Sequence, residues 1–471
     1  LARGTHVLYW MIAARRTRHN FALDHAIARA TELSLPLLVF EPLRVGYHWA
    51  SDRFHTFVLQ GMADNARAFA RAGITYLPYV EPAAGAGSGL LAALAKRAAV
   101  VVTDEQPAFF LPAMVAAAAA KLETRIEQVD GNGILPLRAA DAEFSTAIAF
   151  RRHLQRVGLP YLTSFPRPRP LVRLPASIRD AELPTAISRK WPSASEALLA
   201  AEPGALATLP IDHAVAPVAY RGGAEAGEAV LATFVANRLP RYGEGRNHPD
   251  DDASSGLSPY LHFGHVGAHD VVARVWNTEA WEPSRVAGAK VTGSKTGWWG
   301  MSAAAEAFLD EVIVWRELGY GFCFHRKDHA RYASLPQWAR DTLAAHAGDP
   351  RPHLYTRTQL ATAATADPIW NAAQRQLLAE GRIHNYLRML WGKKILEWSA
   401  SPQAALATLI ELNNKYAVDG RDPSSYSGIF WTLGRFDRPW GRRPIFGMIR
   451  YMSSEATRRK LDLDDYLRRW S

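Results

Sequence analysis

The sequence has very little cysteine and no long apolar run. Cys323 is the only cysteine in 471 residues. A single cysteine excludes an intramolecular disulfide, a zinc site built from cysteines alone and a cysteine-ligated iron–sulfur cluster, and it suits a reducing compartment. No apolar run reaches the roughly 20 residues that a bilayer-spanning helix needs, and the N-terminus does not open with a charged and then apolar signal region. We therefore expect an intracellular, cytoplasmic protein that does not enter a membrane.

Motifs for phosphate loops and metal sites are incomplete. The Gly-rich stretch at 85–89 lacks the spacing of a dinucleotide-binding loop, and GAKVTGSKTG at 288–297 lacks a lysine directly after its second glycine. His325 and His329 stand four apart, but no third ligand accompanies them. We interpret these segments as two loops and a solvated basic stretch, and we predict no metal site.

The composition and length of the chain indicate a globular protein with more than one domain. Hydrophobic residues make up 48% and charged residues 21% of the chain. Its 471 residues exceed what one ordinary core accommodates. Lys and Arg number 55 against 45 Asp and Glu, a net charge of +10, which favours a polyanionic partner.

Three regions follow one another along the chain. Residues 1–135 alternate continuous Val/Leu/Ile runs with amphipathic stretches, which predicts a doubly wound, Rossmann-like α/β domain with a parallel sheet of about five strands. Residues 136–225 are rich in proline and are interpreted as a long interdomain linker with short helices. Residues 226–471 carry apolar residues at helical spacing almost throughout, which predicts an all-α domain.

Two segments of the helical region combine polar and aromatic groups in ways that suggest binding. In DASSGLSPYLHFGH at 252–265, Ser254, Ser255 and Ser258 surround Gly256 before an expected helix. Such a helix start could bind a phosphate, or a serine could simply cap the helix. In DEVIVWREL, Glu311 and Trp315 stand four apart and share a helical face. A carboxylate beside an indole could bind a base, although a half-buried Trp beside a surface Glu is the simpler interpretation.

The stretch from Trp370 to Trp431 concentrates tryptophan and polar residues. Trp391 and Trp398 are seven apart, so they share a helical face on which electron hopping between rings is feasible, but an ordinary aromatic seam would look the same. A buried Arg388 needs a carboxylate partner, and Asp419 is the candidate. Beyond this stretch, aromatic residues alternate with basic ones in the manner of a surface that contacts a phosphate backbone. The basic residues singled out there are Arg442, Arg443 and Arg450.

At this point the sequence strongly resembles the photolyase/cryptochrome superfamily, and within it the class II cyclobutane pyrimidine dimer photolyases. The resemblance is carried by SSGLSPYLHFGH, EAFLDEVIVWREL, WNAAQRQLLAEGRIHNYLRMLWGKKILEW, NKYAVDGRDPSSYSGIFWTLGRFDRPWG and RPIFGMIRYMS. These motifs cover about half of the chain, and the order of an α/β region before a helical region agrees across nearly all of it.

The resemblance implies that the helical domain binds a reduced FAD non-covalently. It also implies a monomeric lyase whose partner is UV-damaged DNA. If the protein is bacterial, we expect it to be associated with the nucleoid. The residues implied around the FAD are Tyr242, Ser254, Ser255, Gly256, Leu257, Ser258, Asn385, Arg388, Asn413 and Asp419. Asn413 matches the residue placed at flavin N5. The dimer pocket would comprise Glu311, Trp315 and Trp431, lined by Tyr386 and Met389. The photoreduction path would comprise Trp391 and Trp370, with Trp398 and Tyr355 as branch residues.

Alternatives to light-driven repair remain at this point. A cryptochrome-like blue-light receptor would keep FAD and the tryptophans without repair, and a light-independent DNA-binding module would be colourless when purified. A second, antenna-type chromophore in the α/β domain could be a deazaflavin or a folate, or the cleft could be empty, because no residue there decides among them.

Overall fold

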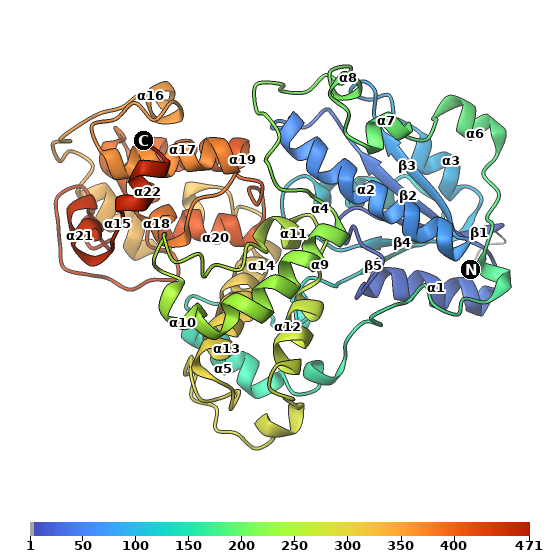
Figure 1. Cartoon of the computed structure of the whole chain (residues 1–471), viewed down its shortest axis with the longest axis horizontal. Coiled ribbons are helices and arrows are strands. Elements are labelled where there is room, and N and C mark those ends of the chain that lie inside the picture. The colour runs from blue at the N-terminus through green and yellow to red at the C-terminus, as the bar shows by residue number, and fades with distance from the viewer. Residues whose placement is uncertain (1–3) are drawn as a thin grey trace. The chain divides into compact units, whose positions relative to one another are not determined.

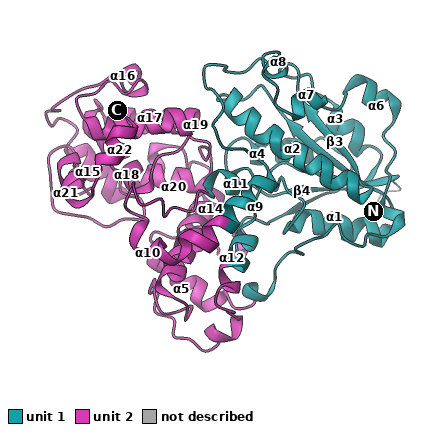
Figure 2. Cartoon of the chain, in the orientation of Figure 1, with its two compact units in different colours: residues 1–136, 161–232, 257–274 teal, residues 137–160, 233–256, 275–471 magenta. Residues whose placement is uncertain are grey.

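The computed structural model describes residues 4–471, and its secondary structure changes in kind along the chain (Figure 1). Parallel strands alternate with helices up to Val129, and helices and loops follow. The chain divides into two compact units (Figure 2). Unit 1 comprises residues up to 136 together with 161–232 and 257–274, and unit 2 comprises residues 137–160, 233–256 and 275–471. The expected linker at 136–225 therefore forms no body of its own, since its segments cluster with one unit or the other.

Unit 1 is built on a sheet of five parallel strands in the order β3-β2-β1-β4-β5. The strands are β1 His6–Trp10, β2 Leu37–Leu43, β3 Thr75–Val80, β4 Ala98–Asp104 and β5 Ile126–Val129. Every residue of β1 and β4 is buried, as expected of strands covered on both faces. The predicted doubly wound α/β domain is confirmed.

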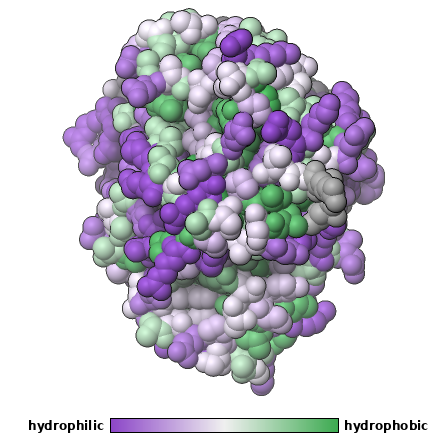
Figure 3. Space-filling model, turned by 90° about the vertical axis from the view of Figure 1, so that its right-hand side faces the viewer, coloured by the Kyte–Doolittle hydropathy of each residue, from purple (hydrophilic) through white to green (hydrophobic). Residues whose placement is uncertain are grey.

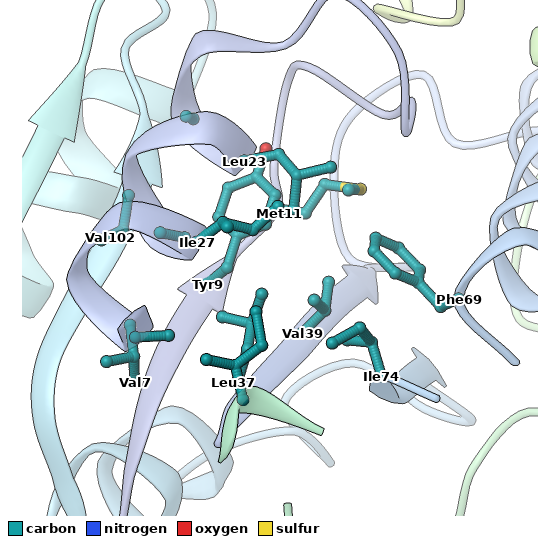
Figure 4. Close-up of a cluster of buried hydrophobic side chains, with 14 of the residues drawn as sticks. Val7, Tyr9, Met11, Leu23, Ile27, Leu37, Val39, Phe69, Ile74 and Val102 are labelled. Atoms are coloured by element: carbon teal, nitrogen blue, oxygen red, sulfur yellow. The ribbon is translucent and has the colours of Figure 1, made fainter. Parts of the chain in front are cut away.

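Alternation along the strands sends side chains to opposite faces of the sheet. One face, with Val7, Tyr9 and Val39, packs on α1 Phe21–Leu33 through residues such as Leu23 and Ile27 (Figure 4). The opposite face packs on α3 Leu90–Ala95 and α4 Leu111–Ala119. The long helix α2 Asp52–Ala72 contributes Phe69 to the first face and Met62 to a third cluster at the edge of the sheet.

Polar groups close the carboxyl end of the central strands. Asp104 at the end of β4 accepts hydrogen bonds from the backbone N–H groups of residues 12, 13 and 14 at 2.8, 2.7 and 3.0 Å, and from the Tyr9 hydroxyl at 2.7 Å. Asn20 caps α1 by accepting from the N–H of Leu23 at 3.1 Å. The turn after β1 is thus fixed by buried side chains.

The other helices of unit 1 are short. They are α6 Thr185–Lys190, α7 Glu196–Leu199, α8 Pro203–Leu206 and α11 Ser258–His262. Two further helices, α9 Ala224–Thr233 and α12 Ala268–Asn277, begin in unit 1 and end in unit 2.

Unit 2 consists of helices and loops apart from an isolated bridge between Arg443 and Gly447. The helices are α5 Ala147–Val157, α10 Tyr242–Gly245, α13 Ala303–Leu309, α14 Arg316–His325, α15 Gln337–Ala345, α16 Arg357–Ala361, α17 Pro368–Glu380, α18 Asn385–Trp398, α19 Pro402–Tyr416, α20 Pro423–Thr432, α21 Ser454–Lys460 and α22 Asp464–Arg469. Two π-helical turns, η4 Phe234–Arg238 and η7 Asp310–Trp315, interrupt longer helical runs. The predicted all-α character of this region is confirmed.

Three of these helices start in the same way. The dipeptides at 367–368, 401–402 and 422–423 each place an Asp or Ser cap before a proline at the first helical position. The cap side chain accepts from a backbone N–H of the first turn, and proline gives up no hydrogen bond there. The starts of α17, α19 and α20 can therefore be read directly from the sequence.

Helix α18 lies at the centre of this bundle, because α17, α19 and α20 all pack against it. Gly392 permits the close approach of α20: a Cβ at this position would lie 2.5 Å from Cγ2 of Thr432. Any larger residue would force the two helices apart, so this glycine has a packing reason.

On the face drawn in Figure 3, hydrophilic side chains predominate and hydrophobic ones are scattered between them, which is ordinary for an exposed surface. Within residues 4–471 no helix has both the length and the apolar character that a membrane crossing requires.

Candidate functional site

A polar cluster joins α18 to α19, to α20 and to the loop between those two helices. The Arg388 guanidinium donates to both carboxylate oxygens of Asp419 at 3.1 Å, and also to the side-chain oxygens of Asn413 and Ser425. The Asn413 amide in turn donates to Ser425 at 2.8 Å and to Asn414 at 3.0 Å. The predicted pairing of Arg388 with Asp419 is confirmed.

The cluster is polar enough to bind the edge of a heterocycle. Asn413 is 2% exposed and Asp419 9% exposed, whereas the Arg388 side chain is 24% exposed. A buried carboxylate is tolerated only with a well-aligned partner, and the two parallel N–H···O contacts of Arg388 provide one. The result is a guanidinium, an amide and a hydroxyl held in fixed positions beside one another.

An aromatic chain begins on the same helix, one turn beyond Arg388. The rings of Trp391 and Trp370 are stacked with centroids 6.3 Å apart and planes at 4°. Trp370 also contacts Trp398 at 5.6 Å, and Trp398 contacts Tyr355 at 5.2 Å. All three indoles are at most 3% exposed. We expected Trp391 and Trp398 to meet along one helical face, but Trp370 from α17 lies in ring contact with both.

Hydrogen bonds fix the first two indoles of this chain. Trp370 Nε1 donates to the carbonyl of Trp391 at 3.0 Å, and Trp391 Nε1 donates to Oε1 of Gln374 at 2.9 Å. Since each buried N–H has a partner, neither ring can turn without losing one.

Glu311 and Trp315 lie on the π-helical turn η7, where a wider helix places residues differently from an α-helix. Glu311 accepts a hydrogen bond from Arg246, and the Arg246 guanidinium lies 5.6 Å from the centre of the Tyr242 ring. Burial raises the pKa of the Glu311 carboxyl, and Arg246 opposes that rise. Trp315 is half-buried. The π turn lies between two ordinary α-helices, α13 and α14, a position where such turns are frequently functional.

Trp431 lies in the last turn of α20, and two basic side chains lie against its ring. Lys393 Nζ is 4.6 Å and the Arg450 guanidinium carbon 5.6 Å from the centre of its ring. Arg450 forms an ion pair with Asp437 at 2.8 Å and lies 4.0 Å from the ring centre of Trp440. Trp431 is half-buried, so the indole is supported from within the protein and accessible from outside.

The segment at 254–258 spans the boundary between the two units. Ser254, Ser255 and Gly256 belong to unit 2, and Leu257 and Ser258 belong to unit 1. Gly256 has a φ of +71°, which glycine adopts without strain. Helix α11 begins at Ser258, and its N-cap is Leu257 without a side-chain hydrogen bond. Leu257, and not a serine, therefore occupies the N-cap position of this helix.

The remaining predicted site residues occupy the surface of unit 2. Asn385 is exposed at the first position of α18, and Tyr386 lies beneath Lys460, whose Nζ is 4.8 Å from the ring centre. Met389 is half-buried on the same helix. Arg442 and Arg443 are exposed, in contrast to Arg450 with its ion pair.

Several residues of the site were missed by sequence reasoning. Arg246 pairs with Glu311 from 65 positions away, Ser425 and Gln374 complete the hydrogen bonds described above, and Lys393 supports Trp431. Only Lys393 could have been noticed in the sequence, because it is a charged residue at a position of α18 where the helical spacing predicts an apolar one. The others depend on contacts between distant segments.

Known proteins resemble this chain over nearly its full length. Proteins named deoxyribodipyrimidine photo-lyase share 32% identity over 468 residues in Methanothermobacter thermautotrophicus (99% of this chain, 95% of that protein) and 35% over 480 residues in Oryza sativa subsp. japonica (98% and 87%). The one from Potorous tridactylus shares 33% over 471 residues, covering 98% of this chain and 81% of the relative. No family model matches the chain.

Two solved structures have the same fold at low sequence identity. A bacterial class III photolyase from Agrobacterium tumefaciens superposes with a TM-score of 0.70 at 18% identity, over 100% of this chain and 87% of that one. A cryptochrome from Synechocystis superposes with a TM-score of 0.71 at 17% identity, over 99% and 88%. At these identities the likeness establishes the fold alone.

Proposed function

Because the chain belongs to the photolyase/cryptochrome superfamily, with full-length relatives named deoxyribodipyrimidine photo-lyase, we propose that it splits cyclobutane pyrimidine dimers in DNA with light, as a class II enzyme of that family. The observation that supports this proposal best is the arrangement of α18. One turn of this helix holds the polar cluster around Arg388, and the next turn starts the aromatic chain at Trp391. A cofactor bound at the cluster would have an electron donor beside it.

The residues of the cluster fit a reduced FAD. Asn413 and Arg388 would offer an amide and a cation to the ring nitrogens and carbonyls of a flavin, and the positive charge would offset the charge of its reduced form. Asp419 would keep Arg388 in place. When bound, FAD would supply the light-excited electron that opens the cyclobutane ring. Tyr242, the 254–258 segment and Asn385 are the further residues that we assign to FAD.

Glu311, Trp315 and Trp431 would bind the dimer after it leaves the DNA helix. A dimer stacks and pairs badly, so flipping it out costs less than flipping an intact base. The indoles would hold it through stacking, and Tyr386 and Met389 would line the same pocket. Glu311, held by Arg246, would hydrogen-bond a pyrimidine of the dimer and help to stabilise the negative charge that the dimer gains.

Exposed basic residues would contact the DNA backbone. Arg442 and Arg443 are free to approach phosphates, whereas Arg450 is paired with Asp437 and is better placed to fix Trp431 and Trp440. We expect the protein to act as a monomer on DNA.

Repair of a dimer-containing oligonucleotide under blue light tests the proposal. Reduced, FAD-loaded protein should restore the intact strand in the light and leave it unchanged in the dark. A yellow protein that binds FAD but repairs nothing would support a cryptochrome-like receptor. A colourless protein that binds DNA equally well in the light and in the dark would contradict the flavin assignment.

A further inference from the structure

A pocket of about 490 Å³ lies in unit 2 at the far end of the aromatic chain. Its walls include Tyr355 and Trp398, the last two members of the chain, and His353. Trp370 connects these residues to Trp391, so the pocket and the polar cluster lie at opposite ends of one series of ring contacts. The volume is within the range of pockets that bind small molecules.

The aromatic wall of the pocket is suited to a planar guest. His353 stacks on Tyr355 with centroids 5.8 Å apart and planes at 21°, and Tyr355 meets Trp398 edge to face at 83°. The Tyr355 hydroxyl is already held, because it accepts from the N–H of Ala366 at 3.0 Å. Because His353 is exposed, a flat ring can stack against its imidazole beside Tyr355.

The charged groups of the pocket favour a neutral guest that can donate a proton. Its lining contains three carboxylates, Asp367, Glu397 and Glu455, against two cations, Lys394 and Arg458. Lys394 is held by Glu397 at 2.8 Å and lies 4.0 Å from Asp367. Glu455 pairs with Arg459 at 2.8 Å and Arg458 lies 3.9 Å from Asp464, so the charge of each cation in the lining is offset by a carboxylate, which disfavours an anionic guest. The carboxylate of Glu397, next to Trp398 in the sequence, can accept an O–H proton.

We propose that this pocket binds a small, neutral, planar reductant with a removable O–H, a phenol or hydroquinone, which refills the aromatic chain after light has drawn an electron from it. The proposal rests on the proposed function, since it requires light-driven electron transfer from Trp391 to bound flavin. It assigns a docking site to the external donor.

Electrons and protons balance across the chain. The electron that leaves Trp391 creates a hole, which passes through Trp370 to Trp398. The donor gives one electron to the Trp398 ring and is oxidised to its neutral radical. One O–H bond of the donor breaks, and its proton goes to Glu397 or to water. Trp398 is restored, and the flavin has gained the one electron that the donor lost.

Binding in the dark tests the docking site separately from any light reaction. FAD-loaded protein is titrated with 4-fluorophenol and followed by fluorine NMR, and saturable binding is expected. Ala366→Trp places an indole in the pocket and should abolish binding. Ala364→Trp is the matched control, since Ala364 is exposed in the same loop but does not line the pocket. His353→Ala should weaken binding about two- to tenfold, the range expected for one aromatic contact.

Transient absorption then tests whether the bound donor reacts. In wild-type protein the decay rate of the tryptophan radical should saturate with hydroquinone concentration, and in Ala366→Trp it should rise only linearly. With the ascorbate anion as donor, the decay rate of the tryptophan radical should rise linearly with donor concentration in both proteins. A linear dependence in the wild type, or phenol binding that survives Ala366→Trp, would overturn the donor site while leaving the proposed function intact. If no tryptophan radical forms in the wild type, the proposed electron path fails, and the donor site fails with it.

Discussion

The indole of Trp370 is parallel to that of Trp391 within 4°, and its Nε1 donates to the Trp391 carbonyl at 3.0 Å. The two residues come from different helices, α17 and α18. This hydrogen bond fixes the Trp370 ring to the Trp391 backbone, and the bond from Trp391 Nε1 to Gln374 fixes the second ring. Trp370 is fully buried. A stack this rigid suits a fixed electron path better than it suits ligand binding.

Trp370→Phe should abolish light-driven flavin reduction and spare repair by chemically reduced protein, because the electron path is broken while the dimer pocket is untouched. Trp391→Phe should behave in the same way. Flavin absorbance under blue light, followed with and without donor, measures the effect.

Trp281→Phe is the matched control for Trp370→Phe, because Trp281 is 5% exposed and its Nε1 likewise donates to a tryptophan carbonyl, that of Trp299. Each variant loses one buried indole hydrogen bond and should lose about 1–3 kcal/mol of stability. Only the Trp370 variant should lose photoreduction. Equal photoreduction in both variants would contradict the assigned path.

Arg388→Gln should weaken FAD retention, because the variant removes the cation and the donors to Asp419, Asn413 and Ser425. The variant also takes the Arg388 charge away from the buried Asp419 carboxylate, which by itself costs stability. The ratio of flavin to protein after gel filtration measures retention.

The double variant Arg388→Gln with Asp419→Asn separates these two effects. It also removes the carboxylate charge that Arg388 no longer offsets and should recover much of the lost unfolding free energy, while FAD retention stays low. If the double variant retains FAD as well as the wild type, Arg388 acts only through folding stability and its cofactor role is wrong.

The elements of this fold were readable from the sequence because their signals are local. Strands such as β1 and β4 are largely apolar runs, and α17, α19 and α20 each begin with a capping Asp or Ser followed by proline. The pairing of Arg388 with Asp419 followed from the cost of an unpaired buried charge. Each of these inferences needed only a short stretch of sequence or a single pairing rule.

Other features required three-dimensional contacts that no local pattern encodes. Periodicity predicted Trp391 beside Trp398, but the ring between them comes from α17. The π-helical turn at 310–315 has the same apolar spacing as an α-helix, so its start and end could not be predicted from the sequence. The partner of Glu311, Arg246, lies in a separate segment whose approach depends on how the helices pack.

Glu311→Gln should lower the yield of repair on the order of tenfold or more, because the side chain keeps its shape but loses the carboxyl group that would hydrogen-bond the dimer and stabilise its charge. Dimer binding should change much less. The side chains of Glu311 and Arg246 are each 28% exposed, so loss of their ion pair should cost at most about 1 kcal/mol of stability.

Repair yield of chemically reduced protein, measured alongside dimer affinity, checks this prediction. Glu244→Gln is the control, since Glu244 is an exposed carboxylate on α10, the helix that precedes Arg246. A Glu311 variant with unchanged yield would remove this residue from the catalytic group.

Lys393 is a fully buried lysine whose Nζ donates to the carbonyl of Thr432 at 2.8 Å beneath the ring of Trp431. Burial lowers its pKa from 10.5 to about 7. Of the charged groups nearby, Asp437 raises this pKa and Arg450 lowers it. Between pH 7 and the ordinary lysine pKa, the unfolded chain therefore binds a proton that the folded protein does not, and stability should rise with pH across this window.

Lys393→Met should remove that dependence. The free energy of unfolding of the variant, relative to wild type, should fall as pH rises from 7 to 9, with a slope of at most about 1.4 kcal/mol per pH unit. Urea unfolding at several pH values measures it. Lys415→Met is the control, because Lys415 also lies over an aromatic ring, that of Tyr416 at 5.6 Å, but is only half-buried. Parallel curves for wild type and Lys393→Met would mean that the buried ammonium keeps its proton throughout, held by Thr432 and the face of Trp431.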